Sequence, residues 1–207
     1  MNTLIIIGAG GHGKVIAETA LAAGWSTIAF YDDAYPSTRH TGQWEILGTS
    51  IDLLNTQSNS PIVIAIGNNM TRIQKATQFK EAGFRFATII HPRAIISPSA
   101  KIGEGTVIFG GAVVNAYATI GDHCIINTNS TVEHECHLNE GVHVSPNAAL
   151  GGGAQIGSMS WVGISACVKQ GARIGESVMI GAGAAVVRDL PSYCTALGVP
   201  ARVIEKN

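Results

Sequence analysis

The stretch Val132-Glu-His-Glu-Cys-His-Leu138-Asn-Glu-Gly-Val-His-Val144-Ser-Pro-Asn-Ala-Ala-Leu150 places an aliphatic residue at every sixth position. The same register runs without interruption from Ile96 to Val186, and the residue four places after each aliphatic anchor is small or nearly so. An α-helix requires apolar residues every three to four positions and an amphipathic strand every two, so a period of six fits neither. The register predicts a parallel β-helix of hexapeptide repeats, in which each hexad supplies one short strand and one corner.

The extent of the register sets the size of this β-helix. Three hexads make one triangular coil of about 18 residues, so residues 96–189 supply roughly five coils. Corner glycines such as Gly103 and Gly121 are expected to relieve crowding where φ is positive. A β-sandwich would instead show turn signals about every 8–12 residues and variable strand spacing, which this register argues against.

The first 91 residues have a different pattern, in which apolar strands alternate with helical segments. This alternation predicts a small parallel α/β sheet with crossover helices. The dipeptide His91-Pro92 marks the domain boundary, because proline ends the preceding element. We therefore expect an α/β domain at 1–91 and a β-helix domain with a C-terminal tail at 92–207. The expected strands are 3–7, 27–31, 61–66 and 84–90, and the expected helices are 14–23, 50–54 and 71–82.

Three strand ends of the α/β domain carry residues suited to nucleotide binding. They are the glycine loop Gly8-Ala-Gly-Gly-His-Gly13, the pair Asp32-Asp33, and Gly67-Asn-Asn69. Ligands of parallel α/β sheets bind beyond the carboxyl ends of the strands. A glycine-rich turn lets backbone N–H groups and a helix N-terminus meet a pyrophosphate. We expect one nucleotide at this edge, as part of a nucleotide sugar.

Two other interpretations of the glycine loop stay open. The spacing G-x-G-x-x-G also matches a dinucleotide fingerprint, with Asp32 about 20 residues further on, where a ribose hydroxyl would bind. NAD is therefore an alternative ligand, although an α/β region that ends near residue 90 has room for one mononucleotide-binding half and not for two. The glycines of the loop would otherwise serve only to tighten a strand-to-helix turn.

Composition narrows the classes of partner. Thirteen Lys and Arg against fourteen Asp and Glu give a formal net charge of −1, which offers no basis for binding nucleic acid or an anionic membrane. We expect a cytoplasmic protein without membrane insertion, because no apolar run reaches about 18 residues and the first strand lacks the basic flank of a signal peptide. A mean hydropathy of +0.25 indicates apolar surface buried between subunits. The cysteines are interpreted as small core residues: Cys124, Cys136, Cys167 and Cys194.

Polar residues interrupt the repeat at Glu133-His-Glu-Cys-His137, and His143 follows. An imidazole can accept a proton from an attacking amine or hydroxyl, and a neighbouring carboxylate can orient the ring. His134 lies two positions after its anchor, at a corner or outward face, whereas His137 directly precedes an anchor and is interpreted as surface. Zinc bound by His134, His137 and His143 is an alternative. We expect no metal, because nearby residues of a flat solenoid diverge from face to face.

Seven motifs spread over nearly the whole chain carry a resemblance to a known family. They are Ile7-Gly-Ala-Gly-Gly-His-Gly-Lys-Val15, Phe30-Tyr-Asp-Asp33, Ala65-Ile-Gly-Asn-Asn69, Ile90-His-Pro92, Val132-Glu-His-Glu-Cys136, His143-Val-Ser145 and Gly198-Val-Pro-Ala-Arg202. In this combination the chain resembles the NeuD family of sialic acid O-acetyltransferases, and within it the PglD-type N-acetyltransferases of UDP-4-amino-4,6-dideoxy sugars. The fold implied is a half-Rossmann α/β domain followed by an all-β left-handed parallel β-helix.

The resemblance also implies an activity and an assembly. It implies a homotrimer that holds acetyl-CoA between neighbouring β-helices and the UDP-amino-sugar on the N-terminal domain. His134 would be the general base for the 4-amino group of the sugar, oriented by Glu135. His143 would contact acetyl-CoA from another face, and the backbone N–H of Gly152 would stabilise the oxyanion. The other contacts implied are Ile164 and Ala182 with pantetheine, and Gly10, Gly11, His12, Asp32, Asp33 and Gly67 with the UDP-sugar.

Two departures from the family pattern leave alternatives open. Gly10 stands where several relatives carry Ser, and residues 36–44 match nothing in the pattern although they lie where sugar selectivity would be set. The same base serves transfer to oxygen, so an O-acetyltransferase acting on sialic acid or another surface-glycan sugar is the main alternative.

Two further classes of protein are disfavoured. The pair His134-Glu135 argues against a non-catalytic nucleotide-sugar sensor or scaffold. The Gly198-Val-Pro-Ala-Arg202 ending and the α/β domain argue against a zinc enzyme of the γ-carbonic-anhydrase kind. The sugar, its stereochemistry and the glycan pathway are left open by the sequence.

Overall fold

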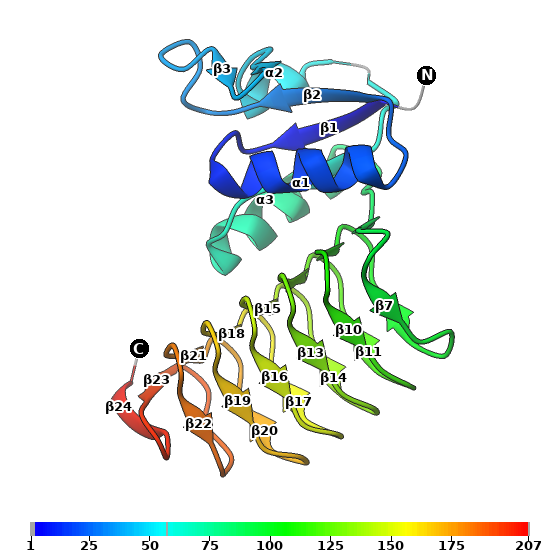
Figure 1. Ribbon diagram of the computed structural model, residues 1–207. Coiled ribbons are helices and arrows are strands. Elements are labelled where there is room, and N and C mark those ends of the chain that lie inside the picture. The colour runs from blue at the N-terminus through cyan, green and yellow to red at the C-terminus, as the bar shows by residue number, and fades with distance from the viewer. Residues whose placement is uncertain (1–2, 57, 207) are drawn as a thin grey trace. The chain divides into compact units, whose positions relative to one another are not determined.

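The computed structural model describes residues 3–56 and 58–206, with the side chains of residues 205 and 206 outside the description. The chain forms two compact units, Met1–Pro92 and Arg93–Asn207 (Figure 1). As predicted, the first is an α/β unit with parallel strands and the second is a β-solenoid.

The α/β unit is built on a parallel three-stranded sheet in the order β2-β1-β5. Its strands are short and apolar, and a core that includes Ile5, Leu53 and Phe79 packs β1 against the second and third helices. The strands are β1 (Thr3–Ile7), β2 (Thr27–Tyr31) and β5 (Ile62–Ile64), and the helices are α1 (Gly11–Ala22), α2 (Ser50–Leu54) and α3 (Asn69–Glu81). Because the strands are parallel, their carboxyl ends meet at one edge, where the glycine loop, Asp32-Asp33 and Gly67 follow.

Two segments of this unit differ from the expected elements. Residues 84–90 do not form a fourth strand of the sheet, because only Phe86 pairs with Ile62, through an isolated bridge. The remaining short strand there is β6 (Ile89–Ile90). Residues 36–44, which the sequence left unassigned, run into an antiparallel hairpin of β3 (His40–Thr41) and β4 (Trp44–Glu45).

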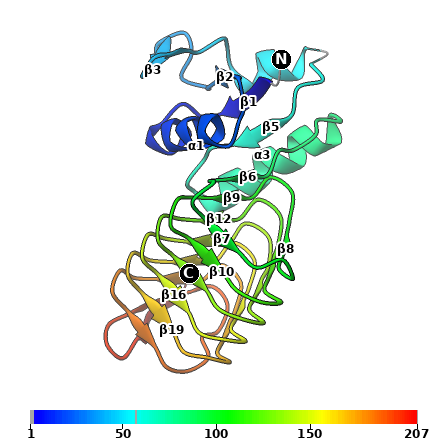
Figure 2. The same ribbon diagram turned by 45° about the vertical axis from the view of Figure 1, so that its right-hand side comes forward.

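The solenoid consists of two-residue strands separated by four-residue corners, and Figures 1 and 2 show them stacked coil upon coil. From β7 to β22 the strands pair in parallel at a spacing of 18 positions, as Val132 does with Val114 and Leu150. The strands of the first face are β7 (Ile95–Ile96), β10 (Val113–Val114), β13 (Thr131–Val132), β16 (Ala149–Leu150), β19 (Cys167–Val168) and β22 (Ala185–Val186). Those of the second face are β8 (Lys101–Ile102), β11 (Thr119–Ile120), β14 (His137–Leu138), β17 (Gln155–Ile156) and β20 (Arg173–Ile174). The third face holds β9 (Val107–Ile108), β12 (Ile125–Ile126), β15 (His143–Val144), β18 (Trp161–Val162), β21 (Met179–Ile180) and β23 (Cys194–Leu197), with β24 (Arg202–Lys206) antiparallel to β23.

The anchors of the register form the core of the solenoid. Val114, Val132 and Leu150 are fully buried, and so are the small residues Ala112 and Ser130 that follow anchors by four positions. The solenoid extends one coil beyond the five expected, since its first face has six strands. The six-residue pattern is thus confirmed as the determinant of this unit.

Some corner glycines have the expected positive φ, as Gly105 and Gly141 do at 67° and 66°, but others serve a purpose that the sequence did not indicate. Gly103 and Gly121 do not have positive φ. A Cβ on Gly103 would lie 2.4 Å from the carbonyl carbon of Gly121, and one on Gly121 would lie 2.8 Å from that of Asn139. These glycines are required because the backbone of the next coil passes where a side chain would be.

The cysteines follow the expectation with one exception. Cys124, Cys136 and Cys194 are buried, whereas Cys167 is exposed, and none of these four cysteines forms a disulfide. The prediction was wrong for Cys167 because it directly precedes the anchor Val168, and successive side chains of a strand point to opposite faces.

None of the helices in the described part of the chain has the length and apolar character needed to cross a bilayer.

Candidate active site

The glycine loop contains two kinds of glycine. Gly8 has φ of +109°, and a Cβ there would lie 2.7 Å from the carbonyl oxygen of Ala65. A Cβ on Gly13 would lie 2.1 Å from the carbonyl oxygen of Gly8, so the turn itself requires both. By contrast, a Cβ on Gly10 or Gly11 would meet nothing within 4 Å. Tightening of the turn therefore explains Gly8 and Gly13 but leaves Gly10 and Gly11 facing open space, where a ligand can approach the backbone.

Asp32 braces the glycine loop. Its Oδ2 accepts a hydrogen bond from the backbone N–H of Ala9 at 2.6 Å, and its Oδ1 accepts one from the N–H of Ala34 at 2.8 Å. Both carboxylate oxygens thus bind backbone. Each oxygen keeps a second lone pair, so these two hydrogen bonds leave the carboxylate able to accept a further one from a ligand hydroxyl. Direct contact between Asp32 and the substrate stays a prediction.

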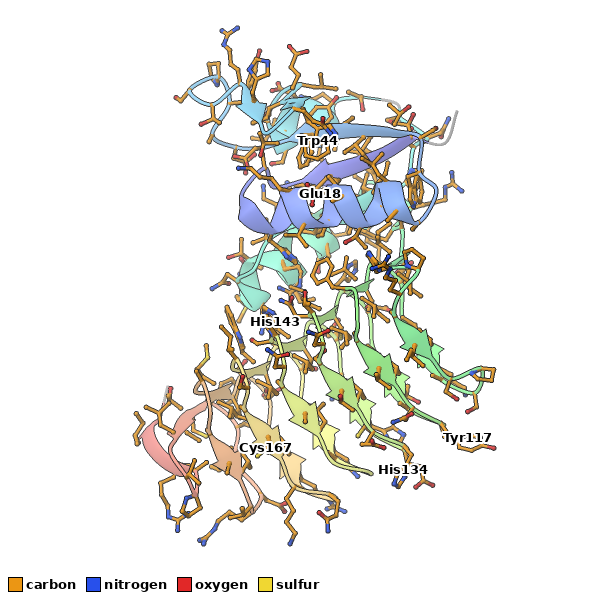
Figure 3. The ribbon with its side chains drawn as sticks, in the orientation of Figure 1. Glu18, Trp44, Tyr117, His134, His143 and Cys167 are labelled. Carbon is orange, nitrogen blue, oxygen red and sulfur yellow. The ribbon has the colours of Figure 1, made fainter. Side chains whose placement is uncertain are left out.

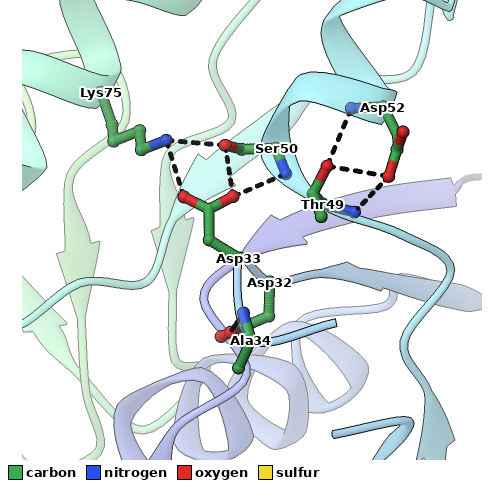
Figure 4. Close-up of polar contacts among 7 residues, drawn as sticks. All are labelled: Asp32, Asp33, Ala34, Thr49, Ser50, Asp52 and Lys75. Carbon is green, nitrogen blue, oxygen red and sulfur yellow. Dashed lines mark hydrogen bonds and ion pairs between the residues drawn. The ribbon is translucent and has the colours of Figure 1, made fainter. Parts of the chain in front are cut away.

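Asp33 belongs to a network that joins three elements (Figure 4). Its carboxylate accepts hydrogen bonds from the N–H and Oγ of Ser50 at 2.9 and 2.6 Å, and from Nζ of Lys75 at 2.9 Å. Desolvation opposes ionisation, but the hydrogen bonds from Ser50 and Lys75 outweigh it and hold the pKa of Asp33 below its usual range. The Asp33 carboxylate is therefore charged at neutral pH and ties β2 to α2 and α3.

His12 lies half-buried in the first turn of α1. Burial, and after it the positive charge of Arg72, lower the pKa of His12 from 6.5 to about 4. The imidazole is therefore neutral at pH 7. A neutral ring at the start of a helix can both donate and accept hydrogen bonds toward a ligand.

Arg72 is a residue of this edge that the sequence analysis missed. The guanidinium is buried, and it donates to the carbonyl oxygens of Ile66 and Gly67 at 2.9 and 3.2 Å and to Oδ1 of Asn69 at 2.7 Å. It thereby fixes the turn at Gly67, where a Cβ would also meet nothing within 4 Å. The sequence did contain a signal for Arg72, because an arginine on the apolar face of an expected amphipathic helix indicates a buried charge with specific partners.

The solenoid presents His134 and Glu135 at the corner between β13 and β14, and Figure 3 labels His134 there. Nδ1 of His134 donates to Oε2 of Glu135 at 3.1 Å, and the two side chains are 60% and 67% exposed. A ring that donates through Nδ1 keeps a lone pair on Nε2, which is free to accept a proton. The corner therefore holds an exposed imidazole whose orientation is set by Glu135.

Gly152 lies beside this imidazole, 18 positions further along the chain. A Cβ on Gly152 would lie 2.4 Å from Nε2 and 2.6 Å from Cε1 of His134. The N–H of Gly153 donates to the carbonyl oxygen of His134 at 2.8 Å, which fixes the neighbouring coil at this distance. The His134 ring can occupy this position only because residue 152 has no side chain.

His143 has a different environment on β15. It is 7% exposed, and its ring stacks on Trp161 with centroids 4.6 Å apart and an interplanar angle of 28°. The side-chain amide of Asn127 donates to Nε2 of His143 at 3.2 Å, and Trp161 donates from Nε1 to Oγ of Ser145 at 2.7 Å. Asn127 and Trp161, which the sequence analysis did not single out, thus hold the imidazole in one orientation.

The predicted site residues of the solenoid fall into two groups. His134, Glu135 and Gly152 share one corner, while His143 projects from the third face, at the opposite edge of the solenoid in Figure 3. Ile164 and Ala182 are both exposed at the corner that follows the third face. The divergence of His134, His137 and His143 also disfavours the zinc interpretation. Among the residues described, no three His, Cys, Asp or Glu side chains are grouped to hold a metal ion.

Comparisons with known proteins agree with both units. The PglD N-terminal domain family matches residues 3–79. A UDP-N-acetylbacillosamine N-acetyltransferase of Bacillus subtilis (strain 168) is 41% identical over 112 residues, 52% of this chain and 51% of that protein, so the chain matches about half of its length. The acetyltransferase domain of PglB from Neisseria gonorrhoeae FA1090 is 41% identical over 99% of this chain and 100% of that one, with a TM-score of 0.95. The chain belongs to the PglD family.

Structures of PglD-like proteins with bound ligands are among the matches, and two of them are as follows. The PglB domain in complex with acetyl coenzyme A is 42% identical over 98% of this chain and 99% of that one, with a TM-score of 0.94. PerB from Caulobacter crescentus in complex with CoA and GDP-perosamine is 36% identical over 99% and 98%, with a TM-score of 0.93. The family resemblance drawn from the seven motifs is therefore confirmed.

We predict that Gly152→Ala displaces the imidazole without unfolding the solenoid. The backbone of Gly152 is outside the positive-φ range, so alanine fits it, and the stability should change by less than about 1 kcal/mol. The new Cβ would nevertheless overlap the ring of His134. A crystal structure should show the ring moved and its bond to Glu135 lost, at a nearly unchanged Tm. Gln170→Ala, at the same corner position of the next coil, is the control, and an unmoved ring in Gly152→Ala would contradict the steric argument.

We predict that the stability of this PglD-family chain falls as the pH drops from about 6.5 to about 4, in part because of His12. The folded state lowers the pKa of His12, so the unfolded state binds more protons in this range and acid favours unfolding. Urea denaturation at pH 7 and pH 5 measures the effect. His12→Gln should show a smaller loss between the two pH values, whereas His40→Gln, at an exposed strand position, should match the unsubstituted chain. An equal loss in all three proteins would contradict the assignment.

Proposed function

We propose that this protein is an acetyl-CoA-dependent N-acetyltransferase that acetylates the 4-amino group of a UDP-4-amino-4,6-dideoxy sugar. The observation that carries the proposal is the oriented His134–Glu135 pair with its lone pair on Nε2, beside Gly152. Support comes from PglB, whose acetyltransferase domain shares this architecture end to end and has been seen with acetyl-CoA.

In the mechanism, Nε2 of His134 removes a proton from the sugar amine as the nitrogen attacks the thioester carbonyl of acetyl-CoA. Glu135 keeps the ring in the reactive tautomer and stabilises the imidazolium that forms. The tetrahedral intermediate carries an oxyanion, for which the backbone N–H of Gly152 is the proposed donor. Collapse of the intermediate expels the CoA thiolate and leaves the acetamido sugar.

The nucleotide sugar is assigned to the open edge of the α/β unit. Gly10, Gly11 and Gly67 offer backbone without blocking side chains, and His12 and Asp33 supply polar groups of fixed charge state. Among the relatives, one is named for UDP-N-acetylbacillosamine and another binds GDP-perosamine. A nucleotide-linked 4-amino sugar is therefore the substrate class, and UDP is the nucleotide we favour.

Acetyl-CoA is assigned to the side of the solenoid that carries His143, with Ile164 and Ala182 along the pantetheine. Because His134 lies on another corner of the same chain, one copy does not complete the site. In a closed ring of copies the site can be completed at each interface, where the His134 corner of one copy meets the His143 face of the next. We propose a homotrimer of this kind, acting in the cytoplasm in the biosynthesis of a glycan.

The first test is acetyl-CoA-dependent thiol release with a UDP-4-amino-4,6-dideoxy-N-acetylhexosamine or with free sialic acid. We expect release with the UDP-amino sugar only. His134→Ala should lower kcat by about 10²–10⁴, as expected for loss of a general base, and leave acetyl-CoA affinity intact. Gln155→Ala, an exposed position elsewhere on the solenoid, is the control. Release with sialic acid alone would instead establish O-acetylation, and full activity of His134→Ala would remove the proposed base.

The second test is complementation between two inactive variants. We expect His134→Ala and His143→Asn each to be nearly inactive, and oligomers that contain both to recover activity. In a cyclic trimer that contains both variants, one of the three interfaces unites an intact His134 with an intact His143. The two variants are co-expressed with different tags, and oligomers carrying both tags are assayed. Mixed oligomers without recovered activity would show that each site is built from a single copy.

A further inference from the structure

The hairpin β3–β4, at the segment that the family pattern left unexplained, contacts the glycine loop. Thr41, in the hairpin, is 3% exposed, and its Oγ1 donates to the carbonyl oxygen of Ala9 at 2.7 Å. The N–H of the same Ala9 donates to Asp32 at 2.6 Å. Ala9 is therefore held from both sides by side chains that lie 23 and 32 positions further along the chain.

The hairpin is itself firmly attached to the sheet. Trp44 packs on Phe30 with ring centroids 5.7 Å apart, and Ile46 pairs in parallel with Phe30. The N–H of Leu47 then donates to the carbonyl oxygen of Phe30 at 2.9 Å. Since Phe30 is a fully buried residue of β2, Thr41 is positioned by the core of the unit.

Holding the Ala9 carbonyl determines the direction of the next N–H group. A peptide unit is planar and trans, so its C=O and N–H point in opposite directions. With the carbonyl of Ala9 directed at Thr41, the N–H of Gly10 is directed away from the hairpin. Gly10 is exposed and has open space around its Cα, so this N–H is available to a ligand.

We propose that Thr41 is a positioning residue for the diphosphate of the nucleotide sugar. It does not touch the ligand. Together with Asp32 it fixes two successive peptide units of the glycine loop, so that the N–H groups that receive a phosphate oxygen are oriented before binding. A loop ordered in advance binds more tightly, because less conformational freedom is lost on binding. This inference rests on the proposed placement of the nucleotide at Gly10 and Gly11.

The test is direct titration of the full-length chain with UDP and, in parallel, with GDP, together with variants of Thr41. Thr41→Val keeps the shape of the side chain and removes the donor, and should raise the Kd for the nucleotide by about 2–10-fold, the effect of one net hydrogen bond. Thr41→Ser keeps the hydroxyl and should bind like the unsubstituted chain. Thr41→Ala leaves room for a water that can replace the donor and should fall between the two. Titration with CoA is the control and should give the same Kd for all four proteins.

The outcomes separate this inference from the proposed function. If the unsubstituted chain binds UDP or GDP and every Thr41 variant binds it equally, the hydroxyl serves folding alone and the positioning role is wrong. If nucleotide and CoA affinities fall together, the substitution acts on the whole chain, and the positioning role is again wrong. If the unsubstituted chain binds neither nucleotide, the proposed substrate class fails and the inference fails with it. The positioning role is supported only if the nucleotide Kd rises most in Thr41→Val, less in Thr41→Ala and not in Thr41→Ser, while CoA binding is unchanged.

Discussion

The pairing of each coil with residues 18 positions away is the constraint on which the solenoid and its chemistry both depend. The buried anchors set this register, because Val132 lies beside Val114 on one side and Leu150 on the other. Once the anchors are stacked, the same register determines which outward-facing side chains of neighbouring coils lie next to each other. The residue beside His134 in the next coil is Gly152, and the absence of a Cβ there admits the imidazole. The position of the candidate base is thus a consequence of how the core is packed.

The same constraint recurs at corners without assigned chemistry. A Cβ on Gly105 would lie 2.2 Å from Nδ1 of His123, and one on Gly111 would lie 2.0 Å from Oδ1 of Asn129. In each pair a glycine faces a polar side chain 18 positions away, as Gly152 faces His134. The coils are only about 4.8 Å apart, so in these pairs the missing Cβ of the glycine makes room for the larger side chain. The site corner is therefore one use of a general packing device, distinguished by the carboxylate of Glu135.

The features that depend on periodicity were predicted from the sequence, whereas those that depend on single side-chain contacts were not. Aliphatic anchors at a constant spacing have one way to be buried together, so the solenoid and the corner position of His134 followed from counting residues. The hairpin at Thr41 could not be predicted, because its two short strands occur once and are not part of any repeat. The fingerprint correctly indicated an acid near the glycine loop. It did not reveal that Asp32 binds the loop itself, since that depends on a 2.6 Å contact across 23 positions.

The backbone conformation at the candidate site is the same as at other corners of the solenoid. Glu135 has φ of 58°, a value that at an isolated position would suggest strain stored for function. Tyr117, His123 and Asn129 share it, each three positions after an anchor, so the conformation belongs to the corner and not to the chemistry. A solenoid of this kind fixes the backbone independently of the reaction. The reaction is then determined by which side chains stand at a few corners, and this is why the repeat alone indicates an architecture while the pair His134-Glu135 indicates an activity.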